Sequence, residues 1–412
     1  MSRIVVLSSV YLGTPSANGI CARNLVTALR AEGYDVDVVC YENQSPSEGE
    51  EKESAYTIPQ PMIKQSHGFV EKFFHVVATV FGSLKTILNT ETVSFYLKRL
   101  REIHQNNPID AIVAMFFPFE SVEAMCRFKA ENNQVKTIIY ELDSVGDGVS
   151  NSSTHFLLGK KYKKWLREKY RTASGTVVMR SHEEYWRRLF GGEFSEKLYV
   201  TDLPVLKDKT AEAKSDNSQI KMLYSGAIEK RYRSPSYLLS VLGDLERKMP
   251  FEMYFYSKGD CEEEIAEASK RVHTIKQFGY VSPEKLENAT LKTDVLINLG
   301  NTFSNSVPSK LISYLGYGKP IIHFSSQKDD VCINYLKDYP LALIVDQSKP
   351  KEYSADEVVE FINSAKGTTV SGVVLNEAFY MNFPRYSAQI VDKIIKQQNA
   401  GAAKQQTLGV KG

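Results

Sequence analysis

Residues 3–41 read RIVVLSSVYLGTPSANGICARNLVTALRAEGYDVDVVCY. The apolar run at 3–10 is typical of a buried strand, and a glycine-containing turn at 13–19 leads into a helix expected over 20–32. A second strand is expected over 35–41. Strand, helix and strand in this order form a βαβ unit, which requires parallel pairing. The opening of the chain therefore predicts a parallel α/β sheet.

Length and composition narrow the class of protein. A chain of 412 residues is too long for one ordinary core, so about two domains are expected. Lys+Arg 51 nearly balances Asp+Glu 49, which gives no electrostatic reason to expect a nucleic-acid partner. The 5 cysteines have no paired spacing, as expected in a reducing cytoplasm. Since no segment reaches the ~18 uninterrupted apolar residues of a membrane span, we expect a soluble or peripheral protein.

The alternation of strand and helix continues through the first half of the chain. Residues 42–60 are polar and are expected to form a surface loop, and the pattern over 67–103 is helical. Further strands are expected over 109–116, 136–142 and 175–179, with helices over 160–170 and 181–189. Residues 207–218, where large apolar residues are almost absent, mark a linker.

After the linker the same alternation starts again. Strands are expected over 221–224, 252–257, 274–278, 295–299 and 320–324, and helices over 236–248, 261–271, 283–289, 309–315, 353–364 and 386–397. The sequence thus predicts an α/β protein of two Rossmann-like doubly wound domains, 1–205 and 206–385, that face each other across a cleft. Residues 386–412 are expected to form a helix that crosses back to the first domain, followed by a flexible tail.

A cluster of cations follows the first strand of the second domain. The stretch 226–233 reads GAIEKRYR, so Lys230, Arg231 and Arg233 come directly after Gly226 and before a helix. Ligands of open parallel sheets collect beyond the carboxyl ends of the strands, and fixed cations there stabilise a departing diphosphate. The alternative is a solvated, charged turn.

A second motif, PSKLISYLGYGKPII at 308–322, combines a helix start with a misplaced charge. Pro308 and Ser309 open the helix, and Lys310 lies in its first turn. A cation there has the wrong sign for the helix dipole. A bound anion would resolve this conflict, so Lys310 is the cation that we most expect to contact a phosphate.

The stretch from Gly279 to Ile322 resembles the donor-binding region of retaining glycosyltransferases with the GT-B fold, family 4 in particular. The resemblance implies that Gly226 and Lys310 approach the donor diphosphate and that Gly279 and Tyr280 lie by the base. It also implies sugar transfer with retention of configuration. No metal is needed if Lys and Arg neutralise the diphosphate, and no cofactor is expected besides the nucleotide-sugar co-substrate. The leaving phosphate would assist the acceptor hydroxyl.

The chain departs from this family at the ribose-binding positions. The family carries two glutamates eight positions apart, where this sequence has Asn305 and Ser313. These side chains, with Ser309, can still hydrogen-bond a donor hydroxyl, although without the charge assistance of a carboxylate. The arginine that commonly follows the loop glycine is Ala227, so Arg231 or Arg233 would contact the phosphate instead.

The first domain is expected to bind the acceptor. Its loop 12–19, with Gly13, Asn18 and Gly19, is similar to the glycine-rich loop of the family beside the reaction centre. These glycines could instead serve the turn alone. Glu141 and Asp143 follow a predicted strand, where a carboxylate could orient an acceptor hydroxyl as a catalytic group. Capping of a helix by Asp143 explains the residue equally well.

No metal site is predicted. Asp35 and Asp37 match the Asp-x-Asp spelling of metal-binding transferases, but at the start of a strand both carboxylates are expected to face solvent. His323 is interpreted as a core residue at the end of a strand.

Two segments bear on membrane contact. Apolar residues recur at helical spacing from Phe69 to Leu88, and the basic segment 160–171 also contains Trp165 and Tyr170. Basic amphipathic helices of this kind rest on anionic lipid surfaces. An ordinary core face and a solvated charged face explain the same residues. A lipid-linked acceptor at the inner face of the membrane would give both segments a purpose.

Three hypotheses follow. The leading one is a nucleotide-sugar-dependent hexosyltransferase that extends a glycan or lipid-linked glycan, as in the assembly of cell-surface polysaccharides. The second is a catalytically silent subunit with the same fold that binds a glycan or a partner. A nucleotide-sugar epimerase has the same fold, but the sequence offers no persuasive carboxylate and histidine arrangement for it.

Overall fold

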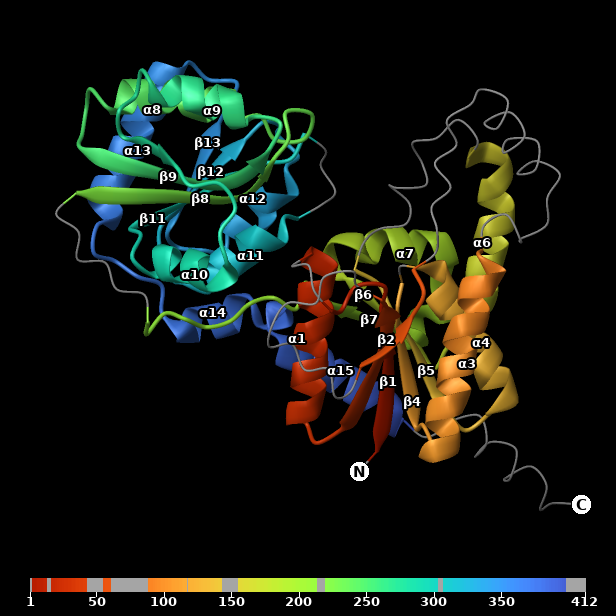
Figure 1. Ribbon diagram of the computed structural model, residues 1–412. Coiled ribbons are helices and arrows are strands. Elements are labelled where there is room, and N and C mark those ends of the chain that lie inside the picture. The colour runs from red at the N-terminus through yellow and green to blue at the C-terminus, as the bar shows by residue number, and fades with distance from the viewer. Residues whose placement is uncertain are drawn as a thin grey trace, which may run out of the picture. The chain divides into compact units, whose positions relative to one another are not determined.

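The computed structural model describes residues 2–12, 16–42, 55–60, 88–116, 118–142, 155–212, 219–302 and 307–397. The chain divides into two compact units (Figure 1). Unit 1 comprises Met1–Pro204 and Met381–Gly412, and unit 2 is Val205–Tyr380. Each unit has its own parallel sheet, and the fold is therefore of the α/β class.

Unit 1 is built on a seven-stranded parallel sheet of order β3-β2-β1-β4-β5-β6-β7. Its strands are β1 (Arg3–Leu7), β2 (Asp35–Tyr41), β3 (Ala55–Ile58), β4 (Ala111–Met115), β5 (Lys136–Tyr140), β6 (Gly175–Met179) and β7 (Leu198–Thr201). Its helices are α1 (Ala17–Ala31), α3 (Thr90–Asn106), α4 (Phe119–Glu131), α6 (His155–Thr172), α7 (Glu183–Phe190) and α15 (Pro384–Lys396), with short 3-10 turns at Arg180–His182, Gly191–Lys197 and Tyr380–Asn382.

Helix α15 connects the end of the chain to unit 1. It packs against α1 and against β5 and β7 of the sheet. Tyr140 Oη on β5 donates to Ser387 Oγ at 2.9 Å, and Tyr34 Oη donates to Asp392 Oδ1 at 2.6 Å. Gly175 gives α15 room, because a Cβ there would lie 2.8 Å from Ile394 Cδ1. The C-terminal helix is thus part of the first core.

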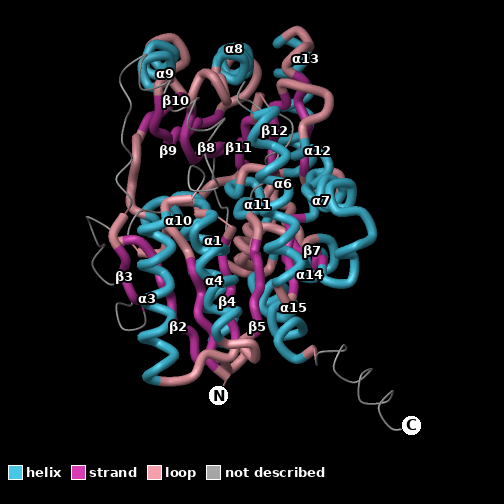
Figure 2. The backbone as a smooth tube through the Cα atoms, turned by 90° about the vertical axis from the view of Figure 1, so that its right-hand side faces the viewer, coloured by secondary structure: helices cyan, strands magenta, loops and turns pink. Residues whose placement is uncertain are grey.

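Unit 2 contains a six-stranded parallel sheet of order β10-β9-β8-β11-β12-β13. Its strands are β8 (Ile220–Ile228), β9 (Phe251–Gly259), β10 (Ile275–Gln277), β11 (Val295–Leu299), β12 (Ile321–Ser325) and β13 (Ala342–Asp346). Its helices are α8 (Ser236–Leu245), α9 (Glu262–Ser269), α10 (Pro283–Leu291), α11 (Ser309–Leu315), α12 (Val331–Leu336), α13 (Lys351–Ala365) and α14 (Gly372–Ala378). Figure 2 shows α8, α9 and α13 on one face of this sheet and α10 and α11 on the other.

Several elements differ from the sequence expectation. The loop expected over 42–60 contains the edge strand β3, which pairs with β2 in parallel. Strand β8 continues to Ile228. Gly226 therefore lies within the strand, paired with Ser257 of β9, and not in a loop. Helix α12 and strand β13 follow β12 without having been anticipated, because the apolar runs that form them are short.

The expectation that Asp35 and Asp37 both face solvent is wrong for Asp37. Arg3 on β1 donates from Nε to Asp37 Oδ2 at 2.6 Å, and Asp37 is buried. The register of β1 and β2 places Arg3 opposite Asp35. Asp37 is two residues further along β2, so its side chain points to the same face of the sheet as that of Asp35. Burial raises the pKa of Asp37, although the hydrogen bond from Arg3 opposes the shift. Asp37 therefore serves an internal ion pair.

The basic segment of α6 uses its apolar side chains in the core of unit 1. Trp165, Leu166 and Tyr170 are buried, and Lys169 Nζ lies 2.6 Å from Glu123 Oε2 on α4. These side chains are therefore not available to a lipid surface. In the apolar segment from Phe69 to Leu88, residues 69–87 lie outside the described residues. Within the part of the chain that the structure describes, no helix is both long enough and apolar enough to cross a membrane.

Candidate functional site

The candidate site of unit 2 lies at the switch point of its sheet. From β8 the chain moves to β9 on one side, and β11 pairs with β8 on the other. In parallel sheets, loops on the two sides of such a point diverge and leave a crevice at the carboxyl ends of the strands. The residues at the ends of β8, β11 and β12 are therefore the ones to consider.

Gly226 lies near the end of β8, two residues before Ile228, and has a backbone conformation that favours glycine. Its φ is +131°, a conformation that other L-residues rarely adopt. Space does not limit this position, because a Cβ would approach only Tyr224 Oη, at 3.8 Å. The following turn is closed by two backbone bonds to the Glu229 carbonyl, from the N–H groups of Tyr232 and Arg233 at 2.8 and 2.7 Å.

The three cations of this turn differ in how firmly they are held. Lys230 and Arg231 are exposed, and the Arg231 guanidinium rests over the Tyr232 ring at 5.4 Å. Arg233 is partly buried, and its Nε donates to Asn301 Oδ1 at 2.6 Å. A guanidinium fixed in this way presents its remaining N–H donors in a defined direction. Arg233 is the better placed of the two arginines predicted to contact a phosphate.

The segment after β11 is bonded to the same turn. Thr302 N donates to the Tyr232 carbonyl at 2.9 Å, and Thr302 Oγ1 donates to the Arg231 carbonyl at 2.9 Å. The ends of β8 and β11 therefore form one hydrogen-bonded layer. Asn305, predicted to contact the donor, is outside the described residues.

Lys310 lies in the first turn of α11, a helix that Tyr314 connects to β8. Tyr314, one turn further along α11 and on the same face, is buried and accepts from Ser225 N at 2.8 Å. Lys310 is partly buried, and among the described residues no carboxylate or hydrogen-bond acceptor pairs with its ammonium group. Burial lowers the pKa of Lys310. A desolvated cation without a counter-charge is the electrostatic environment that an anion would relieve.

The remaining residues predicted to contact the donor are placed less decisively. Ser313 Oγ donates to the Ser309 carbonyl at 3.1 Å, within α11, and both residues are partly buried. Gly279, with φ +65°, and Tyr280, which is 66% exposed, follow β10. Because β9 and β10 lie on the far side of β8 from β11, this pair is separate from the Arg233 layer.

Lys319, within the Gly-Lys-Pro motif, has a structural environment. It is 2% exposed and donates to the carbonyls of Leu291, at 2.6 Å, and Thr293. These carbonyls end α10 and the turn after it. Burial lowers the pKa of Lys319 to about 8. The lysine thus binds the helix end and not a ligand.

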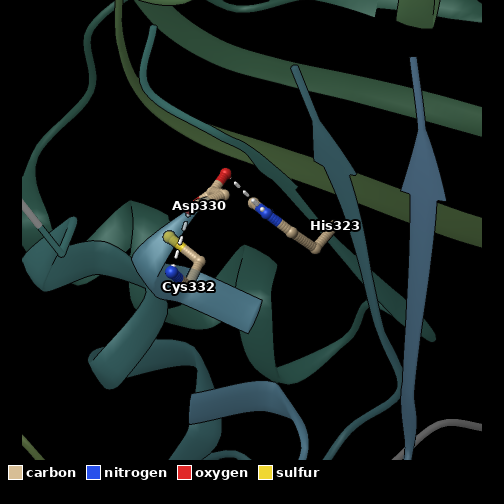
Figure 3. A group of neighbouring side chains, drawn as sticks. All are labelled: His323, Asp330 and Cys332. Carbon is tan, nitrogen blue, oxygen red and sulfur yellow. Dashed lines mark hydrogen bonds and ion pairs between the residues drawn. The ribbon is translucent and has the colours of Figure 1, made fainter. Parts of the chain in front are cut away.

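A buried polar network lies behind the site (Figure 3). His323 on β12 is fully buried, and its Nδ1 contacts Asn298 Nδ2 at 2.8 Å. Its Nε2 contacts Asp330 Oδ2 at 3.0 Å, as Figure 3 shows. Asp330 also caps α12 by accepting from Cys332 N at 2.9 Å. Burial by itself would raise the pKa of Asp330, but the bond to His323 and the cap leave it lowered. The interpretation of His323 as a core residue is confirmed. It lies within β12, and its partners in the core are polar side chains.

Asn298 and Asp330 were not identified from the sequence. A signal for Asp330 exists, because an Asp directly before the run Val331–Leu336 is a typical helix start. Asn298 gives no comparable signal, since a polar residue within the apolar strand 295–299 does not reveal what it faces.

In unit 1, the glycine turn is organised around the start of α1. Ser16 caps this helix by accepting from Gly19 N at 3.1 Å, and Arg23 Nη1 donates to the Tyr11 carbonyl at 2.6 Å. A Cβ on Gly19 would lie 3.1 Å from Ser16 Oγ, so the close turn itself accounts for this glycine. Asn18 is partly buried in the first turn of α1, and Gly13 lies outside the described residues.

The acidic residues after β5 do not form a described site. Glu141 is fully buried and accepts from Tyr170 Oη at 3.1 Å. Its position therefore does not support the prediction that it contacts an acceptor. Asp143, predicted as a catalytic group, lies outside the described residues.

Sequence comparisons found no matching protein family and no matching curated protein. The fold is similar to solved structures along the whole chain. Sucrose-phosphate synthase from Thermosynechococcus elongatus is 13% identical, with a TM-score of 0.56 and 100% of each chain covered. UDP-GlcNAc 2-epimerase from Neisseria meningitidis, bound to UDP-GlcNAc, is 9% identical, with a TM-score of 0.56 over 96% of this chain and 99% of the other. Anabaena HepE, in complex with UDP and glucose, is 11% identical, with a TM-score of 0.53 over 99% and 100%.

At these identities the comparisons establish the fold alone. The two parallel sheets and the structural neighbours define the GT-B fold class. One of these neighbours, WaaG, is described as a glycosyltransferase involved in lipopolysaccharide biosynthesis. The presence of an epimerase among the neighbours means that the chemistry must be argued from the residues of this chain.

Proposed function

We propose that this protein is a metal-independent, retaining glycosyltransferase, similar to family 4, that moves a hexose or related sugar from a nucleoside diphosphate to a glycan or lipid-linked glycan. The observation that carries the proposal is Lys310, a partly buried cation without a partner among the described residues. It lies on the face of α11 that Tyr314 fixes to the end of β8. Assembly of a cell-surface polysaccharide, on the cytoplasmic side of the membrane, would suit such an activity.

The proposed chemistry assigns the diphosphate to Lys310 and Arg233. The bond between the anomeric carbon and the diphosphate oxygen breaks, and the acceptor oxygen bonds to the same face of the sugar. The proton of the acceptor hydroxyl passes to the leaving phosphate. Two cations, one of them fixed by Asn301, would stabilise the charge that develops on the diphosphate. Arg231 and Lys230 would add a more mobile contribution from the exposed side of the turn.

A second candidate is a silent binding subunit of the same fold. It is favoured by Ser313, which stands at the position of a family glutamate and donates its hydroxyl hydrogen to its own helix. A site without that carboxylate would hold the ribose more weakly. Such a protein would bind its ligand without turnover.

The proposal is tested by nucleotide binding and by sugar transfer. Nucleoside diphosphates and nucleotide sugars should raise the melting temperature of the wild-type protein by mass action. Lys310→Ala should reduce donor turnover by about 100-fold or more, since removal of a charge-stabilising donor typically costs this much. Lys285→Ala, an exposed lysine in the first turn of α10, is the matched control and should change neither. Binding of nucleotides without turnover of any donor would favour the silent subunit, and no binding of any nucleotide or nucleotide sugar would reject the transferase.

A further inference from the structure

We infer that His323 is a positioning residue for the diphosphate site: through Asp330 it fixes the loop after β12, and this loop holds Asn301 and thereby Arg233. The inference rests on the proposed function only in assigning Arg233 to the diphosphate. The route from His323 to Arg233 consists of contacts within unit 2.

The first part of the route is the buried pair itself. His323 Nε2 contacts Asp330 Oδ2 at 3.0 Å across the loop that joins β12 to α12 (Figure 3). His323 is completely buried, and Asn298 contacts its other ring nitrogen at 2.8 Å. With both ring nitrogens engaged and the side chain 0% exposed, the imidazole has one orientation, and Asp330 is held in place by it.

The second part is the loop 325–330. Ser325 Oγ lies 3.4 Å from Asp330 Oδ2 and donates to the Gln327 carbonyl at 2.7 Å. Asp330 Oδ1 accepts from Cys332 N at the start of α12. Both ends of the loop are therefore bonded to the residue that His323 fixes.

The third part connects the loop to Arg233. Gln327 Nε2 donates to the Asn301 carbonyl at 2.8 Å, and Asn301 Oδ1 accepts from Arg233 Nε at 2.6 Å. The backbone before Asn301 also lies directly against the buried pair. A Cβ on Gly300 would come within 2.2 Å of Asp330 Oδ2 and 3.3 Å of His323 Cε1. A shift of Asp330 would therefore move the backbone that carries Asn301.

A metal is the competing explanation of the same cluster. His323, Asp330 and Cys332 each offer a ligand atom, and these atoms lie within 4.8 Å of one another. The histidine and the carboxylate already bind each other, and the carboxylate also caps α12. The observed bonds satisfy these groups, so the positioning role explains the geometry without an ion.

The inference predicts a specific energetic coupling. His323→Asn cannot reach Asp330, so the loop loses its anchor and Arg233 its fixed direction. We expect kcat/KM for the nucleotide sugar to fall by about 10- to 100-fold, as misplacement of a charge-stabilising group by ~1 Å can cause. In an Arg233→Lys background, the same substitution should reduce kcat/KM by less than about 3-fold, because residues acting through one another are not additive. His323→Gln, whose amide extends further toward Asp330, should recover part of the loss.

The control is Asp294→Asn, at the opposite end of β11. Asp294 Oδ2 accepts from Lys221 N at 2.7 Å, so this variant also weakens a bond of the sheet, but far from its carboxyl edge. Its effect on kcat/KM should be small and the same in both backgrounds. If His323→Asn does not fold, Asp330→Asn keeps the helix cap, because Asn caps well, and removes the charge. Asp330→Asn then replaces His323→Asn and is measured in both the wild-type and the Arg233→Lys backgrounds.

A readout without substrate separates this inference from the proposed function. The Nε–H resonance of Arg233, assigned by its loss in Arg233→Lys, should shift or broaden in His323→Asn and stay unchanged in Asp294→Asn. A wild-type protein that neither binds nor turns over nucleotides would reject the proposed function, while this resonance still tests the coupling. The inference is overturned if the resonance is unchanged, if the effects of His323 and Arg233 add, or if the purified protein holds one equivalent of zinc that Cys332→Ser loses.

Discussion

At the scale of single residues, the charge state of Lys310 gives the most direct test of an anion site. Burial holds the pKa of the free lysine below its ordinary value of 10.5. A bound diphosphate favours the charged ammonium and should raise this pKa again. Between the lowered and the restored pKa, binding must therefore take up a fraction of a proton.

We expect this proton uptake when UDP is titrated into the protein at alkaline pH, below the ordinary lysine pKa of 10.5, because burial lowers the pKa of the free lysine. Calorimetry in buffers of different ionisation enthalpy would measure it, and the affinity should decrease as pH rises through the same range. Lys310→Met should abolish the uptake, while Lys285→Met should retain it. Identical uptake in the wild type and in Lys310→Met would mean that the phosphate does not contact this lysine.

Lys319 predicts a pH dependence of stability that does not involve a ligand. Its pKa is about 8 in the folded protein and near its ordinary value of 10.5 in the unfolded chain. Between these values the unfolded chain binds more protons, so this residue makes the free energy of unfolding rise with pH. Below pH 8 the cost of burying the charge is present in full.

Urea unfolding between pH 7.5 and 10 should reveal this contribution as a difference between the wild type and Lys319→Met. The wild type should gain stability relative to the variant as pH increases, because only the wild type releases a buried charge. Parallel pH profiles for the two proteins would show that the ammonium group is better solvated than its surroundings indicate.

At the scale of elements, the end of β8 depends on a backbone conformation that only glycine adopts easily. Gly226→Ala places a Cβ at a φ of +131°, and such strain costs about 1–3 kcal/mol. Since the strain would be relieved by moving the cation turn, UDP affinity should fall together with the free energy of unfolding.

A second glycine-to-alanine variant shows whether the effect is specific to position 226. Gly243→Ala lies inside α8, where a Cβ would meet Val272 Cγ2 at an ordinary 3.6 Å. Alanine is the better helix former by up to ~1 kcal/mol, so this variant should be neutral or more stable and should bind UDP normally. If Gly226→Ala leaves stability and affinity unchanged, the backbone at position 226 does not require glycine.

At the scale of the whole molecule, the division of the chain predicts which fragments fold. Unit 2 is continuous, from Val205 to Tyr380, and has its own apolar core. Unit 1 requires α15, whose residues Ala388, Val391 and Ile394 are buried. A fragment 205–380 should therefore fold alone, whereas 1–204 should not.

Circular dichroism and thermal unfolding of the two fragments would test this. The fragment 205–380 should unfold cooperatively and bind UDP, and 1–204 should bind a hydrophobic dye and aggregate. Adding residues 381–397 to 1–204 through a flexible linker should restore folding. Cooperative unfolding of 1–204 alone would show that α15 covers a core that is already stable.

Much of the architecture follows from local patterns in the sequence. The alternation of strand and helix predicted two doubly wound sheets, and the helix over 309–315 coincides with α11, because Pro308 marks its start. The edge strand β3 and the late pair α12 and β13 were missed. Their apolar runs are short, and an edge strand needs only one partner to form.

The class of fold and the presence of cations near the carboxyl edge of the second sheet follow from the amino-acid sequence alone. Both depend on residues close together in the chain. The tertiary structure decided how these cations are held, because the bonds between Arg233 and Asn301 and between Tyr314 and Ser225 join residues 68 and 89 positions apart. It also turned Asp37, Glu141 and Lys319 into internal partners and gave His323 a route to the site. Burial and long-range contacts arise only when distant strands pair, and no local pattern records them.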